Sequence, residues 1–146
     1  MSSNHVIEKF KNHNRRRCER YLSRLTLLVT TFGSDEVFEV MTLNISETGT
    51  LVGSATTPPF KLNTIIEGRV DPKSAGLDDE PLYFVGRVVR VAKHDETAVA
   101  DFKSQYGVDA NLRSIFGFEL NDMPEKDIKL WINLVAKAES DAQARA

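Results

Sequence analysis

The chain has 146 residues, 41% of them hydrophobic, so one domain can bury a sizeable core without disulfides or a structural metal. A single cysteine excludes an internal disulfide framework. No apolar run is long enough to span a membrane, and no signal peptide with a hydrophobic core stands near the N-terminus. We therefore expect a soluble, cytoplasmic protein without direct membrane insertion.

The net charge of −2 conceals an uneven distribution. Residues 1–24 carry seven basic side chains and two acidic ones, whereas the rest of the chain carries twelve basic and nineteen acidic side chains. The acidic remainder would repel a long polyanion lying across the surface. A compact anion therefore fits this chain better than DNA or RNA.

The chain begins with a polar segment, residues 1–14, which we expect to be a flexible arm. The stretch from Tyr21 to about Thr31 is rich in Val, Leu and Thr and predicts a first β-strand. Turn-forming residues at 33–36 separate it from a second predicted strand at 37–43. The two strands should form a hairpin.

The middle of the chain predicts further short strands. One at 51–52 ends before two consecutive prolines, which cannot donate to a strand ladder. Alternation within the strand at 82–91 places one set of side chains on a common face, namely Phe84, Gly86, Val88 and Arg90. A total of about six or seven strands is typical of a small antiparallel barrel closed on itself. The other predicted strands lie at 65–70, 98–102 and 115–120.

One helix is predicted near the C-terminus. Asp122 is placed to cap it, Pro124 lies in its first turn, and Glu125 completes the spacing of a capping box. Its apolar stripe should pack against the barrel or serve as a docking or homodimer face; the stripe comprises Ile128, Trp131, Ile132 and Val135. The stripe ends near Ala138, and we expect residues 139–146 to be a disordered tail.

Two short motifs stand in a fixed order. The first, Arg16-x-x-x-Arg20, lies in a run of arginines, and the second, Asn44-x-Ser46-x-x-Gly49, begins 24 residues after Arg20. With the strand-like stretches between them, the motifs resemble the signature of PilZ domains, which are small bacterial β-barrels. The stretches 86–91 and 116–120 are similar to two further family strands, so the resemblance spans about residues 15–138.

The resemblance implies a receptor for the second messenger cyclic di-GMP rather than an enzyme. A guanidinium can pair bidentately with phosphate oxygens and with the O6/N7 edge of guanine, and this ligand presents both. The amide and hydroxyl of the second motif would donate from a turn, and its glycine permits a positive φ or a close backbone approach. The implied ligand-binding residues are Arg15, Arg16, Arg20, Asn44, Ser46 and Gly49.

Two arginines have additional expected contacts. Arg15 could stack on a guanine face or hold a second ligand molecule. Arg90 stands near the position where some family members carry a ligand-stacking tryptophan, so it is a candidate for stacking on the ligand. The receptor would change conformation when its arginine loop orders over the ligand, and it would signal to a separate effector protein.

Two other functions remain open on the sequence. One is an adaptor that keeps the barrel but binds no nucleotide, and the other is a nucleic-acid-binding module that uses the basic N-terminus. Cys18 lies among arginines, whose charge favours a reactive thiolate, although such a cysteine is more often incidental. The three histidines show no ligand spacing, so no metal and no cofactor beyond the ligand is expected. No catalytic residues are predicted, and the stretch 103–114 is longer than a tight hairpin requires.

Overall fold

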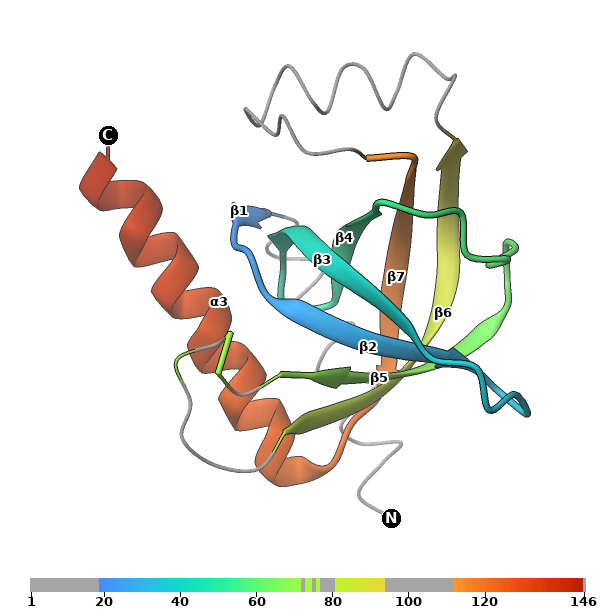
Figure 1. Ribbon diagram of the computed structural model, residues 1–146. Helices are drawn as coiled ribbons and strands as arrows, with labels where there is room; N and C mark the ends of the chain where they lie inside the picture. The colour runs from blue at the N-terminus through green and yellow to red at the C-terminus, as the bar shows by residue number, and fades with distance from the viewer. Residues whose placement is uncertain (1–18, 72, 75, 77–80, 94–111, 146) are drawn as a thin grey trace.

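The computed structural model describes residues 19–145, apart from 72, 75, 77–80 and 94–111 (Figure 1). The expected N-terminal arm, the expected strand at 98–102 and Cys18 lie outside the described residues. Within the described part, the elements are β1 (Tyr21–Leu22), β2 (Thr26–Thr31), β3 (Phe38–Ile45), β4 (Gly49–Ser54), β5 (Ile65–Val70), β6 (Leu82–Lys93), β7 (Ser114–Asp122) and α3 (Glu125–Arg145).

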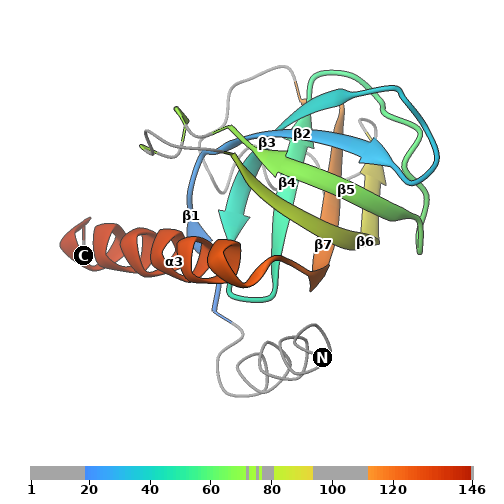
Figure 2. The same ribbon diagram turned by 90° about the horizontal axis from the view of Figure 1, so that it is seen from below.

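Six of these strands close into an antiparallel barrel in the order β2, β3, β4, β7, β6, β5, and β5 pairs back with β2. The short strand β1 adds to the end of β3. Helix α3 lies beside the barrel, next to β1 (Figures 1 and 2). The predicted mainly β fold, a small closed barrel with a C-terminal helix, is confirmed.

The barrel interior is filled by alternate apolar side chains of the strands, as the two-residue period of a strand requires. At one side of this core, Phe60 makes edge-to-face contacts with Phe38 and Phe116, with ring centroids 5.4 and 5.0 Å apart. Helix α3 contributes Trp131, which is fully buried in the same cluster. The helix is therefore part of the core rather than an appendage.

A second buried cluster lies on the outer face of the wall formed by β3, β4, β7 and β6. It consists of Leu43, Leu51, Ala92, Leu112 and Ile115. Residues paired directly across neighbouring strands share a face, so Gly53, Ile115 and Ala92 form one row across β4, β7 and β6. Leu112 covers the Gly53 end of this row, which accounts for the last residues of the stretch 103–114.

The first predicted strand, from Tyr21 to Thr31, is two strands in the structure because a side chain intervenes between them. The hydroxyl of Thr42 donates to Ser23 O at 2.6 Å and accepts from Leu25 N at 2.7 Å. These contacts replace the ladder bonds that a continuous strand would make with β3. Thr42 itself is fully buried.

Helix α3 differs from the expectation at both ends. It continues to Arg145, so the expected disordered tail is wrong for residues 139–145; this stretch lacks Gly and Pro and holds Ala, Glu, Gln and Arg, which are good helix formers. At the other end, Asp122 belongs to β7 and accepts from Met123 N at 2.9 Å instead of capping the helix. The first helical bonds are accepted by the carbonyl of Pro124.

Candidate functional site

The fold brings the two motifs into contact. Strand β1 pairs with the end of β3, with Tyr21 opposite Ile45 and Leu22 opposite Asn44. This pairing places Arg20, the residue before β1, next to the second motif, where its Nη1 donates to Asn44 Oδ1 at 3.4 Å. The arginine is exposed. Arg15 and Arg16 lie outside the described residues, so their predicted contacts stay predictions.

A β-bulge sets the direction of Asn44. In the β3–β4 ladder, Thr42 pairs with Val52 and Asn44 with Leu51, so Leu43 is an extra residue. In a regular strand with the same number of residues, Asn44 would point into the barrel like Thr42, two positions earlier. The bulge instead turns Asn44 onto the outer face, beside Leu51 and within reach of Arg20.

The second motif closes a tight turn between β3 and β4. Ser46 N donates to Gly49 O at 2.9 Å, and Gly49 N donates back to Ser46 Oγ at 3.1 Å. The hydroxyl also donates to Gly49 O at 3.2 Å, and Ser46 is only 4% exposed. In this structure the serine holds the turn together, in keeping with the turn preference of its residue type, and its predicted contact with the ligand is untested.

Gly49 is required by close packing. A Cβ built on it would lie 2.6 Å from the main-chain oxygen of Phe118 in β7, a distance that real Cβ atoms do not adopt. Of the two reasons offered by the sequence, the close backbone approach therefore applies. A positive φ does not, since the glycines with positive φ in the described part of the chain are Gly33 and Gly76.

Two residues outside the motifs donate hydrogen bonds to this turn, and the spacing of the motifs did not predict their involvement. The hydroxyl of Thr50 donates to Asn44 O at 2.8 Å. The indole Nε1 of Trp131 donates to Ser46 O at 2.9 Å, across 85 positions of sequence. Helix α3 is therefore hydrogen-bonded directly to the second motif.

Arg90 does not lie on the face that the simple alternation of β6 predicted. Val88 pairs with Phe118 and Arg90 with Gly117, so Val89 is an extra residue and the alternation changes phase there. Arg90 is exposed, and its Cβ lies 3.0 Å from the position that a Cβ on Gly117 would occupy. The bulge moves Arg90 from the face of Phe84, Gly86 and Val88 to the outer face.

The two bulges place Asn44 and Arg90 in one row across the outer wall. The row runs from Asn44 to Leu51, Gly117 and Arg90, on four successive strands. At about 4.8 Å per strand, its ends are about 14 Å apart along the wall. Stacking of Arg90 on a ligand stays a prediction, but the register puts it on the face of the motif asparagine.

The sequence pattern of the PilZ domain matches residues 14–137. The chain belongs to the PilZ family. PilZ domains are binding and adaptor domains rather than enzymes. No curated protein matches the sequence.

Three solved structures share the PilZ fold with this chain. The PilZ domain of YcgR from Escherichia coli, solved with c-di-GMP, has a TM-score of 0.61 at 9% identity, over 87% of this chain and 93% of that one. The inhibitor of motility MotI/DgrA from Bacillus subtilis has a TM-score of 0.61 at 12% sequence identity. The match covers 84% of this chain and 50% of that chain. The PilZ domain of CeSA from a cellulose-synthesizing bacterium has a TM-score of 0.53 at 16% sequence identity, and the match covers 83% of this chain and 98% of that chain.

In this PilZ domain, one titrating side chain links the arginine segment to the helix. Tyr21 donates to the Glu19 carboxylate at 2.7 Å. That hydrogen bond, burial and the negative charge of Glu139 on α3 together raise the pKa of Tyr21 to about 12. The phenol therefore stays protonated at physiological pH and acts as a donor between two carboxylates.

A pocket of about 640 Å³ is lined mainly by apolar side chains. Among the described residues, Lys61 is the one charged side chain in its lining, and none of Arg20, Asn44, Ser46 and Gly49 contributes to it. It therefore suits a doubly charged anion less well than the outer wall does. No helix in the described part is long and apolar enough to cross a membrane.

Proposed function

We infer that this PilZ domain is a receptor for cyclic di-GMP that changes conformation on binding and signals to a separate effector protein in the bacterial cytoplasm. The observation that carries the proposal is the contact that joins the two motifs, between the exposed Arg20 and the buried Asn44. The contact is long for a charge-assisted hydrogen bond, so a phosphate or a guanine edge can compete for the guanidinium.

The proposed change passes through the turn. A ligand that takes Arg20 away from Asn44 alters the end of β3, and that turn is bonded to Trp131 of α3. Helix α3 also meets β1 next to Arg20. The helix and the arginine segment together would form the surface that the effector reads, in line with a binding-induced ordering transition.

Isothermal titration calorimetry with cyclic di-GMP tests the proposal on the full chain. Wild type should bind saturably, and Arg20→Ala should bind about ten- to a hundredfold more weakly, because a charge-assisted bond is lost. Arg69→Ala is the matched control, since Arg69 is exposed on β5, the strand opposite the site. GTP should give no comparable heat. Absence of binding by the wild type would favour the adaptor that binds no nucleotide.

A further inference from the structure

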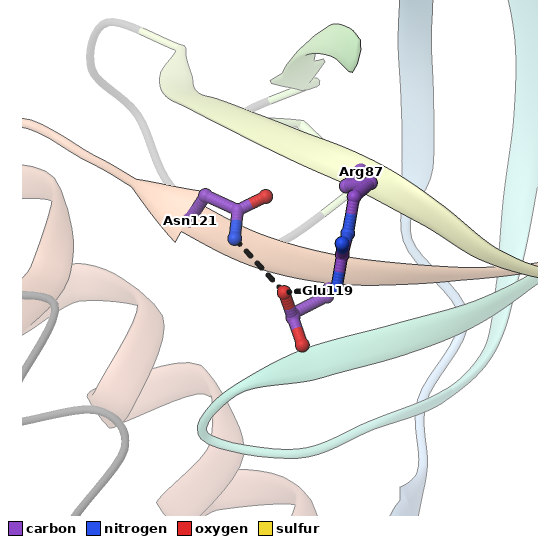
Figure 3. Close-up of polar contacts among 3 residues, drawn as sticks. All are labelled: Arg87, Glu119 and Asn121. Carbon is purple, nitrogen blue, oxygen red and sulfur yellow. Dashed lines mark hydrogen bonds and ion pairs between the residues drawn. The ribbon is translucent and has the colours of Figure 1, made fainter. Parts of the chain in front are cut away.

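A polar cluster lies beside the second motif on the same outer wall. In the register, Gly49 of β4 pairs with Glu119 of β7, and Glu119 pairs with Arg87 of β6. This row is two residues, about 7 Å, from the row that holds Asn44 and Arg90. Figure 3 shows Arg87 and Asn121 on either side of the Glu119 carboxylate.

Both donors of the cluster bond to the same oxygen of the Glu119 carboxylate. Glu119 Oε1 accepts from Arg87 Nη2 at 3.2 Å and from Asn121 Nδ2 at 2.9 Å. Both hydrogen bonds end on this one oxygen, and the side chains of Arg87 and Glu119 are 41% and 44% exposed. The carboxylate is therefore oriented by two donors while its second oxygen stays an available acceptor.

The hydrogen bonding of the cluster is incomplete. Arg87 Nε and Asn121 Oδ1 are both buried without a partner in the part of the chain that the structure describes. A native structure that keeps a donor and an acceptor unpaired in one cluster is arranged for a further partner or a rearrangement. A ligand can reach the exposed carboxylate directly, whereas these two buried atoms become paired only if the cluster rearranges.

The backbone beneath the carboxylate is held closely between neighbours. A Cβ on Gly49 would lie 2.6 Å from Phe118 O, and a Cβ on Gly86 would lie 2.6 Å from Glu119 O. Asn121 is itself the extra residue of a bulge, because Val85 pairs with Asp122 and Gly86 with Leu120. Close packing on both sides keeps this part of β7 rigid, which favours precise positioning of the Glu119 side chain.

We propose that Glu119, oriented by Arg87 and Asn121, reads the Watson–Crick edge of one guanine of the ligand. The inference rests on the proposed cyclic di-GMP function and assigns the base specificity of that same site. Guanine presents two adjacent donors there, N1–H and the 2-amino group, and the second oxygen of the carboxylate has two lone pairs that can accept from both. Adenine presents an acceptor at N1, which the carboxylate would repel.

Affinities for three ligands on three proteins test this assignment. Wild type should prefer cyclic di-GMP to cyclic di-AMP, and it should bind cyclic di-IMP, which lacks the 2-amino groups, about tenfold more weakly than cyclic di-GMP. Glu119→Gln should lose about ten- to a hundredfold in cyclic di-GMP affinity and should no longer distinguish cyclic di-GMP from cyclic di-IMP. Glu36→Gln, in the exposed turn after β2, should behave as wild type.

The outcomes separate the two proposals. If wild type binds cyclic di-GMP and Arg20→Ala binds it about ten- to a hundredfold more weakly, while Glu119→Gln keeps wild-type affinity and selectivity, the receptor proposal stands and the role of Glu119 is overturned. If wild type binds none of the ligands, both are overturned. The side chains of Arg87 and Glu119 are partly exposed and their ion pair is partly screened by water, so Glu119→Gln should fold normally, as circular dichroism would verify.

Discussion

The indole nitrogen of Trp131 donates a hydrogen bond of 2.9 Å to the main-chain oxygen of Ser46, so the C-terminal helix and the second motif form one hydrogen-bonded unit. Trp131 is fully buried and is the single tryptophan of the chain. Its fluorescence therefore reports on the environment of the turn without interference from another indole.

Titration with cyclic di-GMP should change the emission of Trp131, because the ligand acts on the turn to which the indole is bonded. GTP should leave the emission unchanged. Calorimetric binding without any change in emission would show that α3 does not sense the occupied site.

Replacing the same residue tests its structural role. Trp131→Phe removes the donor to Ser46 O and leaves a small cavity, so it should lower the free energy of unfolding by about 2–4 kcal/mol. Urea denaturation followed by circular dichroism measures the loss. Tyr83→Phe, at a half-exposed position on β6, should change the free energy of unfolding by much less.

Gly49→Ala should destabilise the domain by about 1–3 kcal/mol, because the added Cβ meets the main chain of Phe118 and the strands must separate. Affinity for cyclic di-GMP should fall as well, since β4 and β7 support both rows of the outer wall. Thr48→Ala, in the same turn, adds no atom and serves as the control. Equal thermal midpoints for the two variants would contradict the close-packing role of the glycine.

Thr42→Val preserves the shape of a fully buried side chain but removes its hydroxyl. The main-chain groups of Ser23 and Leu25 then lose their partner, at a cost of about 2–4 kcal/mol in the free energy of unfolding. Thr31→Val, at the half-buried end of β2, should be nearly neutral. Chemical denaturation of both variants decides whether Thr42 fixes the connection between β1 and β2.

The pKa of Tyr21, raised to about 12, predicts a stability change at alkaline pH. Between the ordinary value near 10 and the raised value, the folded state holds a proton that the unfolded state has lost. The stabilisation from Tyr21 is therefore complete below pH 10 and is lost as the pH rises towards 12. Tyr21→Phe should remove this part of the pH dependence, and tyrosinate absorbance should show the missing titration.

The sequence predicted those parts of the fold that depend on local patterns. Strand β5 has the predicted bounds, and the hairpin of β2 and β3 follows from apolar runs on either side of a turn. For Gly49 the sequence left two explanations open, a positive φ and a close backbone approach. The pairing of β4 with β7 shows that the close approach is the reason.

The directions of side chains near the site could not be predicted in this way. Leu43, Val89 and Asn121 are extra residues only in relation to neighbouring strands, so no pattern within one strand marks them. The same holds for the contacts of Thr42 and Trp131, whose partners are 17 to 85 positions away. Long-range pairing, rather than local propensity, assembles the candidate site.

The bulges at Leu43 and Val89 each add one residue between two pairs whose partners are consecutive on the neighbouring strand. Deleting either residue would restore regular alternation and leave Asn44 opposite Leu51, or Arg90 opposite Gly117, on the outer face. The solved PilZ domains share this fold at 9 to 16% identity. Variants that lack Leu43 or Val89 are therefore expected to keep the directions of Asn44 and Arg90 while losing the local bend and twist of the bulge, so their ligand affinity would report on strand shape alone.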